Sequence, residues 1–108
     1  MNLLRYLFSA VLFLIASAIF GQNGFIRGTV FDDATGESLP GVTIFAEGTT
    51  TGTMTDFDGK FNLSIAPGSY NLRVSFISYE TLNLREIKVS PGNVTLFENL
   101  RLKEARIE

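Results

Sequence analysis

The sequence contains no cysteine, no histidine and no tryptophan in its 108 residues. Without cysteine the chain can form no disulfide framework, thiol nucleophile, iron–sulfur site or lipid-modified cysteine. Without histidine it lacks the commonest general base and the commonest transition-metal ligand. Carboxylate chemistry and the binding of hard cations stay open. Because each cluster of acidic residues is also better explained as a turn, the sequence predicts a protein that is not an enzyme and that has no catalytic residue, metal ligand or cofactor.

Basic residues are also scarce and scattered. The chain carries nine Lys and Arg against eleven Asp and Glu, a formal net charge of −2. Only Arg5 lies within the first 21 positions and no acidic residue does, so the remainder carries 8 − 11 = −3. A mildly acidic domain without a basic cluster has no electrostatic footprint for nucleic acid. The length allows one small domain.

The first 21 residues have the order of features of a secretory signal peptide. Arg5 supplies the early positive charge, Leu7–Ile15 is almost entirely apolar, and small residues follow at Ala16–Ala18. We expect cleavage after Ala18 or after Gly21. The second is favoured because Gly21 ends the apolar run at a polar segment.

An uncleaved membrane anchor is the alternative reading of this segment. The apolar run from Leu7 to Phe20 has about 14 residues, fewer than the roughly 20 that a spanning helix needs. No later segment is long and apolar enough to span as a helix. The sequence therefore predicts an exported protein with no membrane span in the mature chain.

From residue 25 onward the pattern is that of short strands. Apolar and polar residues alternate, most regularly from Tyr70 to Phe76, and helical spacing never persists. Turn residues recur between the runs, and Asp58-Gly59 favours a tight hairpin turn. The pattern predicts an all-β sandwich or a small barrel, with a Phe-rich inner face. The expected strands cover 25–31, 42–46, 53–56, 61–65, 70–76, a segment around 87–89, and 94–102.

Five segments together resemble a known family. They are Ile26–Asp32, Thr35–Ile44, Gly48–Asp56, Asp58–Phe61 and Pro67–Tyr79. In this order they are similar to the carboxypeptidase-regulatory-like domain. The resemblance implies a seven-stranded, transthyretin-like (prealbumin-like) Greek-key β-sandwich. It divides the chain into a signal peptide over 1–21, a short segment over 22–24, the sandwich over 25–102 and a C-terminal tail over 103–108.

One position departs from the family pattern. Ser78 stands where the pattern usually has Gly before the Tyr, and Ser tolerates fewer backbone conformations than Gly. This substitution leaves the expected fold in place, but it predicts that the turn at Ser78 can differ from that of the family.

The match resembles most the form of this domain found in Bacteroidetes, at the N-terminus of TonB-dependent outer-membrane receptors. Leu100–Glu108 is similar to the segment that leads toward the TonB box and plug of such receptors. The resemblance implies a non-catalytic interaction module, the N-terminal extension or a fragment of a receptor for nutrient uptake. It also implies a location in the periplasm or at the periplasmic face of the outer membrane. Its implied partners are envelope proteins or the receptor's own plug and barrel. The alternative is a free-standing exported module that binds carbohydrate.

Three aromatic residues are candidates for a ligand or partner surface: Phe57, Tyr79 and Phe45. Together with Tyr70 and Phe97 they are candidates for a sugar-binding surface. Packing in the core is the competing interpretation, because most aromatic side chains of a small β domain are interior.

Two groups of acidic residues are candidate sites. Asp56 and Asp58 form D-x-D-G, which hints at a calcium loop, but the spacing is wrong and the closing Glu is missing, so a turn is favoured. Asp32, Asp33 and Glu37 could do acid–base work, but they are expected to be solvated residues of an exposed turn.

Overall fold

The computed structural model describes Leu3 and residues 22–106. Leu3 aside, the predicted signal peptide, with both candidate cleavage points, lies outside the described residues. Within the described part of the chain, no helix is long and apolar enough to cross a membrane.

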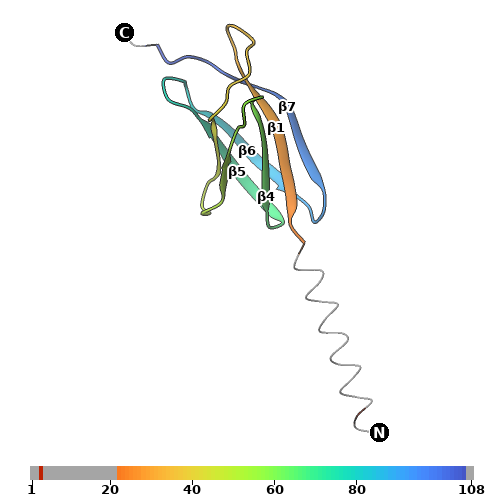
Figure 1. Cartoon of the computed structure of the whole chain (residues 1–108). Coiled ribbons are helices and arrows are strands. Elements are labelled where there is room, and N and C mark those ends of the chain that lie inside the picture. The colour runs from red at the N-terminus through yellow and green to blue at the C-terminus, as the bar shows by residue number, and fades with distance from the viewer. Residues whose placement is uncertain (1–2, 4–21, 107–108) are drawn as a thin grey trace.

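Seven strands form two sheets packed face to face (Figure 1). The first sheet has the order β4-β1-β7 and the second the order β3-β2-β5-β6. The strands are β1 Gly24–Asp32, β2 Thr43–Ala46, β3 Gly52–Met54, β4 Lys60–Ile65, β5 Gly68–Ser75, β6 Leu82–Val89 and β7 Val94–Leu102. The all-β sandwich expected from the sequence is confirmed, and the strand bounds are within two residues of those predicted except in β6.

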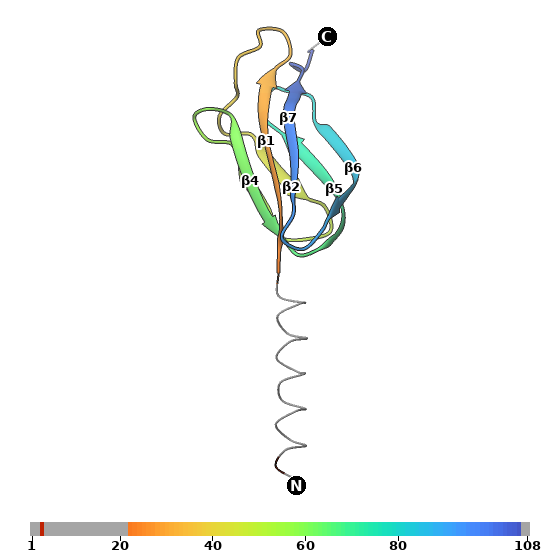
Figure 2. The same cartoon turned by 90° about the vertical axis from the view of Figure 1, so that its right-hand side faces the viewer.

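Strand β1 is the central strand of the first sheet. It pairs antiparallel with β4 and parallel with β7, so that the first and last strands lie side by side and run in the same direction (Figure 2). Ile26 and Val30 point inward and are completely buried. This arrangement follows from the two-residue period of the sequence, which places alternate side chains on opposite faces of a strand.

The hairpin prediction at Asp58-Gly59 is wrong. A turn does form there, but β3 and β4 belong to different sheets, so the turn carries the chain across the sandwich. The amide N–H of Gly59 donates to the carbonyl of Asp56, and the amide of Val30 on β1 donates to the carbonyl of Gly59. The dipeptide fixes the local reversal, but which strands pair is decided by the packing of the whole sandwich.

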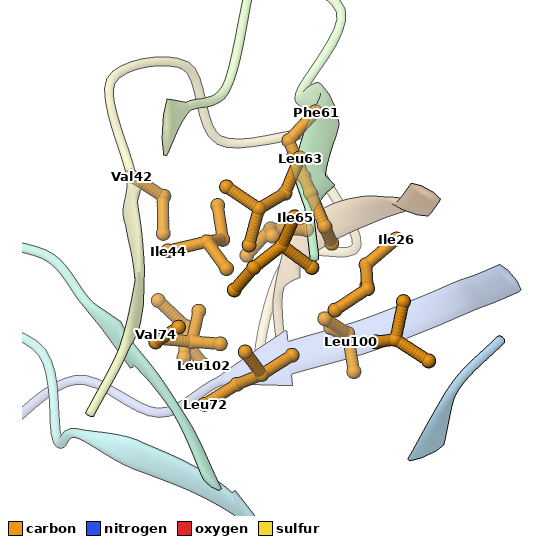
Figure 3. Close-up of a cluster of buried hydrophobic side chains, with 13 residues drawn as sticks. Ile26, Val42, Ile44, Phe61, Leu63, Ile65, Leu72, Val74, Leu100 and Leu102 are labelled. Atoms are coloured by element: carbon orange, nitrogen blue, oxygen red, sulfur yellow. The ribbon is translucent and has the colours of Figure 1, made fainter. Parts of the chain in front are cut away.

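The core between the sheets is aliphatic (Figure 3). Its thirteen buried residues include a single aromatic residue, Phe61. The predicted Phe-rich inner face is therefore wrong. Strands β2 and β5 direct Ile44, Leu72 and Val74 inward, whereas Phe45 falls on the outward-facing position of β2. Branched aliphatic side chains fill the space between two closely packed sheets without the bulk of a ring.

Strand β6 begins at Leu82, five residues before the predicted segment around Ile87. The strand has an irregularity at Glu86, whose φ is +55°, and the register with β5 shifts between Tyr70 and Leu72. The Asn71 side chain accepts a hydrogen bond from the amide of Glu86 at 3.0 Å. A bulge of this kind interrupts the alternation of side chains, which explains why the first half of β6 is hard to recognise from the sequence.

Candidate functional site

The loops at one end of the sandwich hold most of the candidate residues. Because of the strand directions, the connections over 33–42, 55–59 and 76–81 lie at the same end, and the C-terminal segment leaves there too (Figure 2). We call these three connections the acidic end. They contain five acidic residues and no basic residue, whereas the three connections at the opposite end contain one acidic residue, Glu47.

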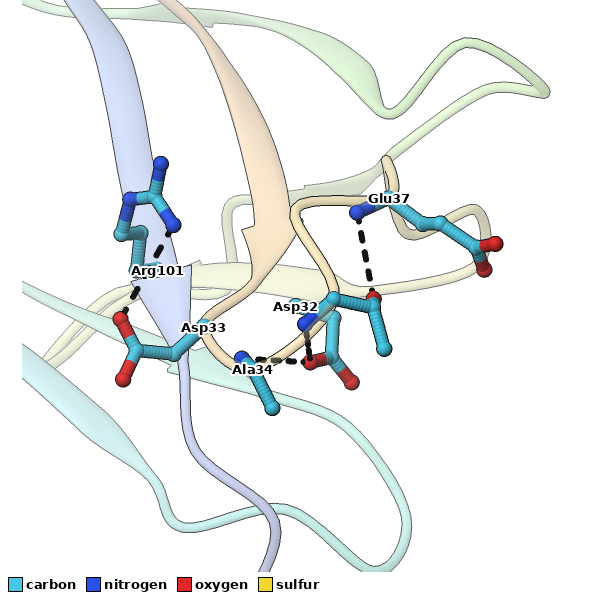
Figure 4. A network of polar contacts seen from close by, with 6 residues as sticks. Asp32, Asp33, Ala34, Glu37 and Arg101 are labelled. Carbon is cyan, nitrogen blue, oxygen red and sulfur yellow. Dashed lines mark hydrogen bonds and ion pairs between the residues drawn. The ribbon is translucent and has the colours of Figure 1, made fainter.

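Asp32 organises the first of these connections (Figure 4). One carboxylate oxygen accepts hydrogen bonds from the amides of Ala34 and Thr35, at 2.8 and 3.0 Å. The backbone closes the same turn, since the amide of Asp32 donates to the carbonyl of Glu37. Asp32 is only 5% exposed. The expectation that it is a solvated turn residue is therefore wrong, because its own side chain is buried and its carboxylate accepts backbone amides of the turn in place of water.

Tyr79 connects the third connection to this turn. Its hydroxyl donates to the second carboxylate oxygen of Asp32 at 2.6 Å, across 47 positions of sequence. That hydrogen bond, assisted by the amides of the turn, lowers the pKa of Asp32 below its ordinary value of 3.8. The same bond, together with burial and the nearby negative charge, raises the pKa of Tyr79 to about 12. The Tyr79 hydroxyl therefore stays protonated and the Asp32 carboxylate stays ionised over a wide pH range.

The C-terminal segment pairs with the loop that carries Tyr79. The amide of Glu80 donates to the carbonyl of Lys103 at 2.7 Å, and the amide of Ala105 donates to the carbonyl of Ser78 at 2.9 Å. Ser78 has a φ of +69°, in the left-handed region that favours glycine. The substitution noted in the sequence therefore leaves a turn with a glycine-like backbone.

The acidic residues of D-x-D-G act as turn residues. One carboxylate oxygen of Asp56 accepts hydrogen bonds from the amides of Asp58 and Lys60, at 2.9 and 3.0 Å. Among residues 22–106, no group of three acidic side chains is placed to hold a metal ion. Asp33 faces Arg101 at 4.0 Å, and both side chains are largely exposed.

The three aromatic candidates do not form one surface. Phe45 lies on the outer face of the second sheet, with the Arg73 guanidinium 5.6 Å from its ring centre. Tyr79 is half-buried, is held by Asp32, and packs near Phe76. Phe57 alone is free, with 95% of its surface exposed in the connection from β3 to β4. Neither a shared surface nor packing in the core describes all three residues.

Besides Phe57, four large apolar residues within residues 22–106 are exposed, and the sequence does not predict their exposure. Ile77 is 83% exposed in the β5–β6 connection, Met54 is 60% exposed on β3, and Leu96 and Val94 are 57% and 48% exposed on β7. Alternation along a strand predicts a face for each residue but not whether another part of the chain covers that face. Ile77 also lines a shallow hollow, together with Gly41, Thr43, Ser75 and Phe76.

Comparisons with known proteins agree on the kind of domain. A family model described as the CarboxypepD_reg-like domain matches residues 26–108. The TonB-dependent receptor SusC of Bacteroides thetaiotaomicron is 42% identical over 85 residues, covering 74% of this chain and 8% of that receptor. The TonB-dependent receptor P3 of Formosa agariphila is 36% identical over 78 residues, covering 72% of this chain and 8% of that receptor. The chain thus spans less than a tenth of the length of these curated relatives.

Solved structures support the fold. A cohesin–X-dockerin complex from Acetivibrio cellulolyticus aligns with a TM-score of 0.65 at 19% identity, covering 73% of this chain and 56% of that one. A putative carbohydrate binding protein from Bacteroides uniformis aligns with a TM-score of 0.52 at 18% identity, covering 72% of this chain and 41% of that one. At such identities the likeness concerns the β-sandwich alone.

Proposed function

Because this chain belongs to the CarboxypepD_reg-like domain family, we propose that it is a non-catalytic interaction module, the N-terminal extension of a TonB-dependent receptor that takes up nutrients. The observation that carries the proposal is the 42% identity to TonB-dependent receptor SusC over 85 residues. The module works on the periplasmic side of the outer membrane, against envelope proteins or the receptor's own plug and barrel.

The polar residues support a binding role rather than catalysis. Asp32 and Asp56 each use a carboxylate oxygen to accept two backbone amides, and the hydroxyl of Tyr79 is engaged by Asp32. Side chains that are committed to holding turns have little capacity left for proton transfer to a substrate. What the domain offers to other molecules is its shape, its acidic end and its exposed apolar side chains.

An antibody raised against residues 22–106 tests the proposal in the native organism. We expect it to detect, in the outer-membrane fraction, a polypeptide with the size of a TonB-dependent receptor, and the reading frame to continue past codon 108 into a plug and barrel. A signal found only at about the mass of the sandwich, with no receptor gene beside it, would contradict the proposal.

The carbohydrate-binding alternative has less support from the residues. A sugar-binding platform needs an open aromatic face, and the guanidinium of Arg73 lies over the ring of Phe45. Binding of a polysaccharide that is lost on replacing Phe45, with the Phe57 variant unaffected, would restore that alternative.

A further inference from the structure

Strand β4 forms one edge of the first sheet, and the side of it that faces away from β1 is open (Figure 2). The amide of Phe25 donates to the carbonyl of the residue before β7, so the backbone groups of Phe25 point toward β7. Successive residues of a strand point their backbone groups to opposite sides, so Ile26 points toward β4, where it pairs with Leu63. The backbone groups of Asn62 and Ser64 therefore point away from β1, toward the open side.

Within residues 22–106, no other segment hydrogen-bonds to these backbone groups. β4 pairs only with β1, and the amides and carbonyls of Asn62 and Ser64 take part in no turn or loop bond. Both residues are exposed. Two amides and two carbonyls, spaced two residues apart along an edge, are the arrangement with which an added strand pairs.

At Lys60, the first residue of β4, the same side of the strand already has its partners. The amide of Asp56 donates to the carbonyl of Lys60 at 2.8 Å, and the amide of Lys60 donates to the Asp56 carboxylate at 3.0 Å. That carboxylate also accepts the amide of Asp58. The turn thus supplies at Lys60 the donor and the acceptor that a neighbouring strand would supply, and the open edge starts beyond it, at Asn62.

The other three sheet edges carry features that hinder the addition of a strand. β3 has only three residues. β6 is interrupted at Glu86, where φ is +55°, and the register of β7 with β1 shifts between Gly28 and Val30. β4 has six residues, pairs with β1 without a shift, contains no proline and has its one charged residue at its start. It is therefore the edge that the fold leaves fit for a partner strand.

The outward side chains beside this edge include two basic residues. Arg27 lies opposite Asn62, and its Nε donates to the Asn62 side-chain oxygen at 3.2 Å. Lys60 lies opposite Thr29, and Arg27, Thr29 and Lys60 line one hollow, to which β7 contributes Glu98 from the far side of β1. Within residues 22–106, neither Arg27 nor Lys60 forms an ion pair. Side chains on neighbouring strands favour opposite charges, so an acidic residue suits the outward side of a strand added here.

We propose that the open edge of β4 binds an extended segment of another protein, which adds to the first sheet as a fourth strand and carries Asp or Glu on its outward side. The backbone groups of Asn62 and Ser64 bind its main chain, and Lys60 and Arg27 select its acidic side chains. A second copy of β4 fits this edge less well, because that strand contains no acidic residue. This proposal rests on the proposed function as an interaction module and assigns the surface and the partner chemistry.

Synthetic peptides of about eight residues, mixed with the purified full chain, test the proposal. One set alternates Thr or Val with Glu, and the matched set has Lys in place of Glu. We expect only the glutamate set to bind, with an affinity that falls as salt is raised. N-methylation of one set of alternate residues in the glutamate peptide should abolish binding, and N-methylation of the other set should leave it, because one edge of a sheet takes only every second amide of an added strand.

Variants of β4 test the same contact from the side of the domain. Asn62→Pro removes the open amide without breaking a bond between β4 and β1, and should weaken binding of the glutamate peptide at least about tenfold. Asn62→Thr keeps that amide and is the matched control, which should bind as the parent does. Lys60→Glu changes only an exposed side chain and should lower the affinity for the glutamate set and raise that for the lysine set. Circular dichroism confirms the fold of all three.

Each other outcome overturns the proposal. Equal binding of the two peptide sets removes the assigned charge, and binding that survives Asn62→Pro or both patterns of N-methylation removes the backbone contact. No peptide binding removes the edge as a docking surface. Sedimentation that shows self-association abolished by Asn62→Pro would assign the edge to a second copy. These measurements use the purified chain, so they can fail while the antibody test still finds a receptor-sized polypeptide.

Discussion

At Ser78 the backbone has a φ of +69°, a conformation that costs a side-chain-bearing residue free energy relative to glycine. The carbonyl of Ser78 also accepts the amide of Ala105, so the turn cannot relax without losing that bond. We expect Ser78→Gly to raise the free energy of unfolding by about 0.5–1 kcal/mol, measured by urea denaturation. Ser75→Gly, in the extended backbone of β5, should lower it by a similar amount. A Ser78→Gly variant less stable than the parent would contradict this account.

The bond between Tyr79 and Asp32 makes stability depend on pH in two ranges. The pKa of Asp32 is lower in the folded chain than 3.8, so its contribution is present above pH 3.8 and is lost as pH falls further. The pKa of Tyr79 is raised from 10.0 to about 12, so its contribution is present below pH 10.0 and is lost as pH rises toward 12.

Tyr79→Phe isolates this pair from the other titrating groups. We expect the variant to be less stable than the parent at neutral pH, and the difference between the two to shrink at both pH extremes, as followed by denaturation at a series of pH values. In the double variant Asp32→Asn, Tyr79→Phe, the free energy of unfolding should show no pH dependence that comes from this pair. If the free energies of unfolding of the parent and of Tyr79→Phe differ by the same amount at all pH values, the hydrogen bond does not depend on the ionisation of Asp32 or Tyr79.

At the scale of the element, Gly28 explains how closely β1 packs between its neighbours. A Cβ on Gly28 would lie 2.4 Å from the carbonyl oxygen of Phe97 and 2.8 Å from the ring of Phe61. Neither the backbone of β7 nor a core ring can move away freely. Gly28→Ala should therefore lower the free energy of unfolding by about 1–3 kcal/mol in urea denaturation. Thr29→Ala, at the outward-facing neighbour, is the control, and equal effects of the two would argue against this packing.

The elements also show what a single sequence can and cannot predict. β5 was predicted nearly to its ends because its alternation is regular and turn residues bound it. β1 and β7 were predicted from apolar runs bounded by turn residues, although the register between the two strands shifts between Gly28 and Val30. The first half of β6 was missed because the bulge at Glu86 interrupts the alternation. The crossing of the chain between sheets at Gly59 was missed because a turn dipeptide encodes a local reversal and carries no information on distant pairing.

In the candidate site, too, local features could be predicted from the sequence and long-range contacts could not. Phe57 was singled out from the sequence and is exposed, but the bond between Tyr79 and Asp32 joins residues 47 positions apart and has no local signal. Met54 and Ile77 were missed because exposure depends on what the rest of the chain covers. The side chains of a site can be recognised from their types, whereas their neighbours are set by the assembled fold.

At the scale of the whole molecule, the two sheets share one core and should unfold together. Leu72 of the second sheet and Leu63 of the first are both buried in it. We expect Leu72→Ala and Leu63→Ala each to lower the free energy of unfolding by about 2–5 kcal/mol, with one transition and an unchanged dependence on denaturant. Fluorescence and far-ultraviolet circular dichroism should report coincident transitions. Two separated transitions in either variant would show that the sheets are independent.

The parallel pairing of β1 with β7 has a mechanical consequence. Because both strands run the same way, the sandwich is entered at one end by Gly24 and left at the other after Leu102. A tensile force applied between these points acts along the two strands and loads their hydrogen bonds in shear, all at once. An antiparallel pair pulled from the same end would instead lose its hydrogen bonds one after another. A pull between Gly24 and Leu102 is therefore opposed by the whole set of hydrogen bonds between β1 and β7 at the same time.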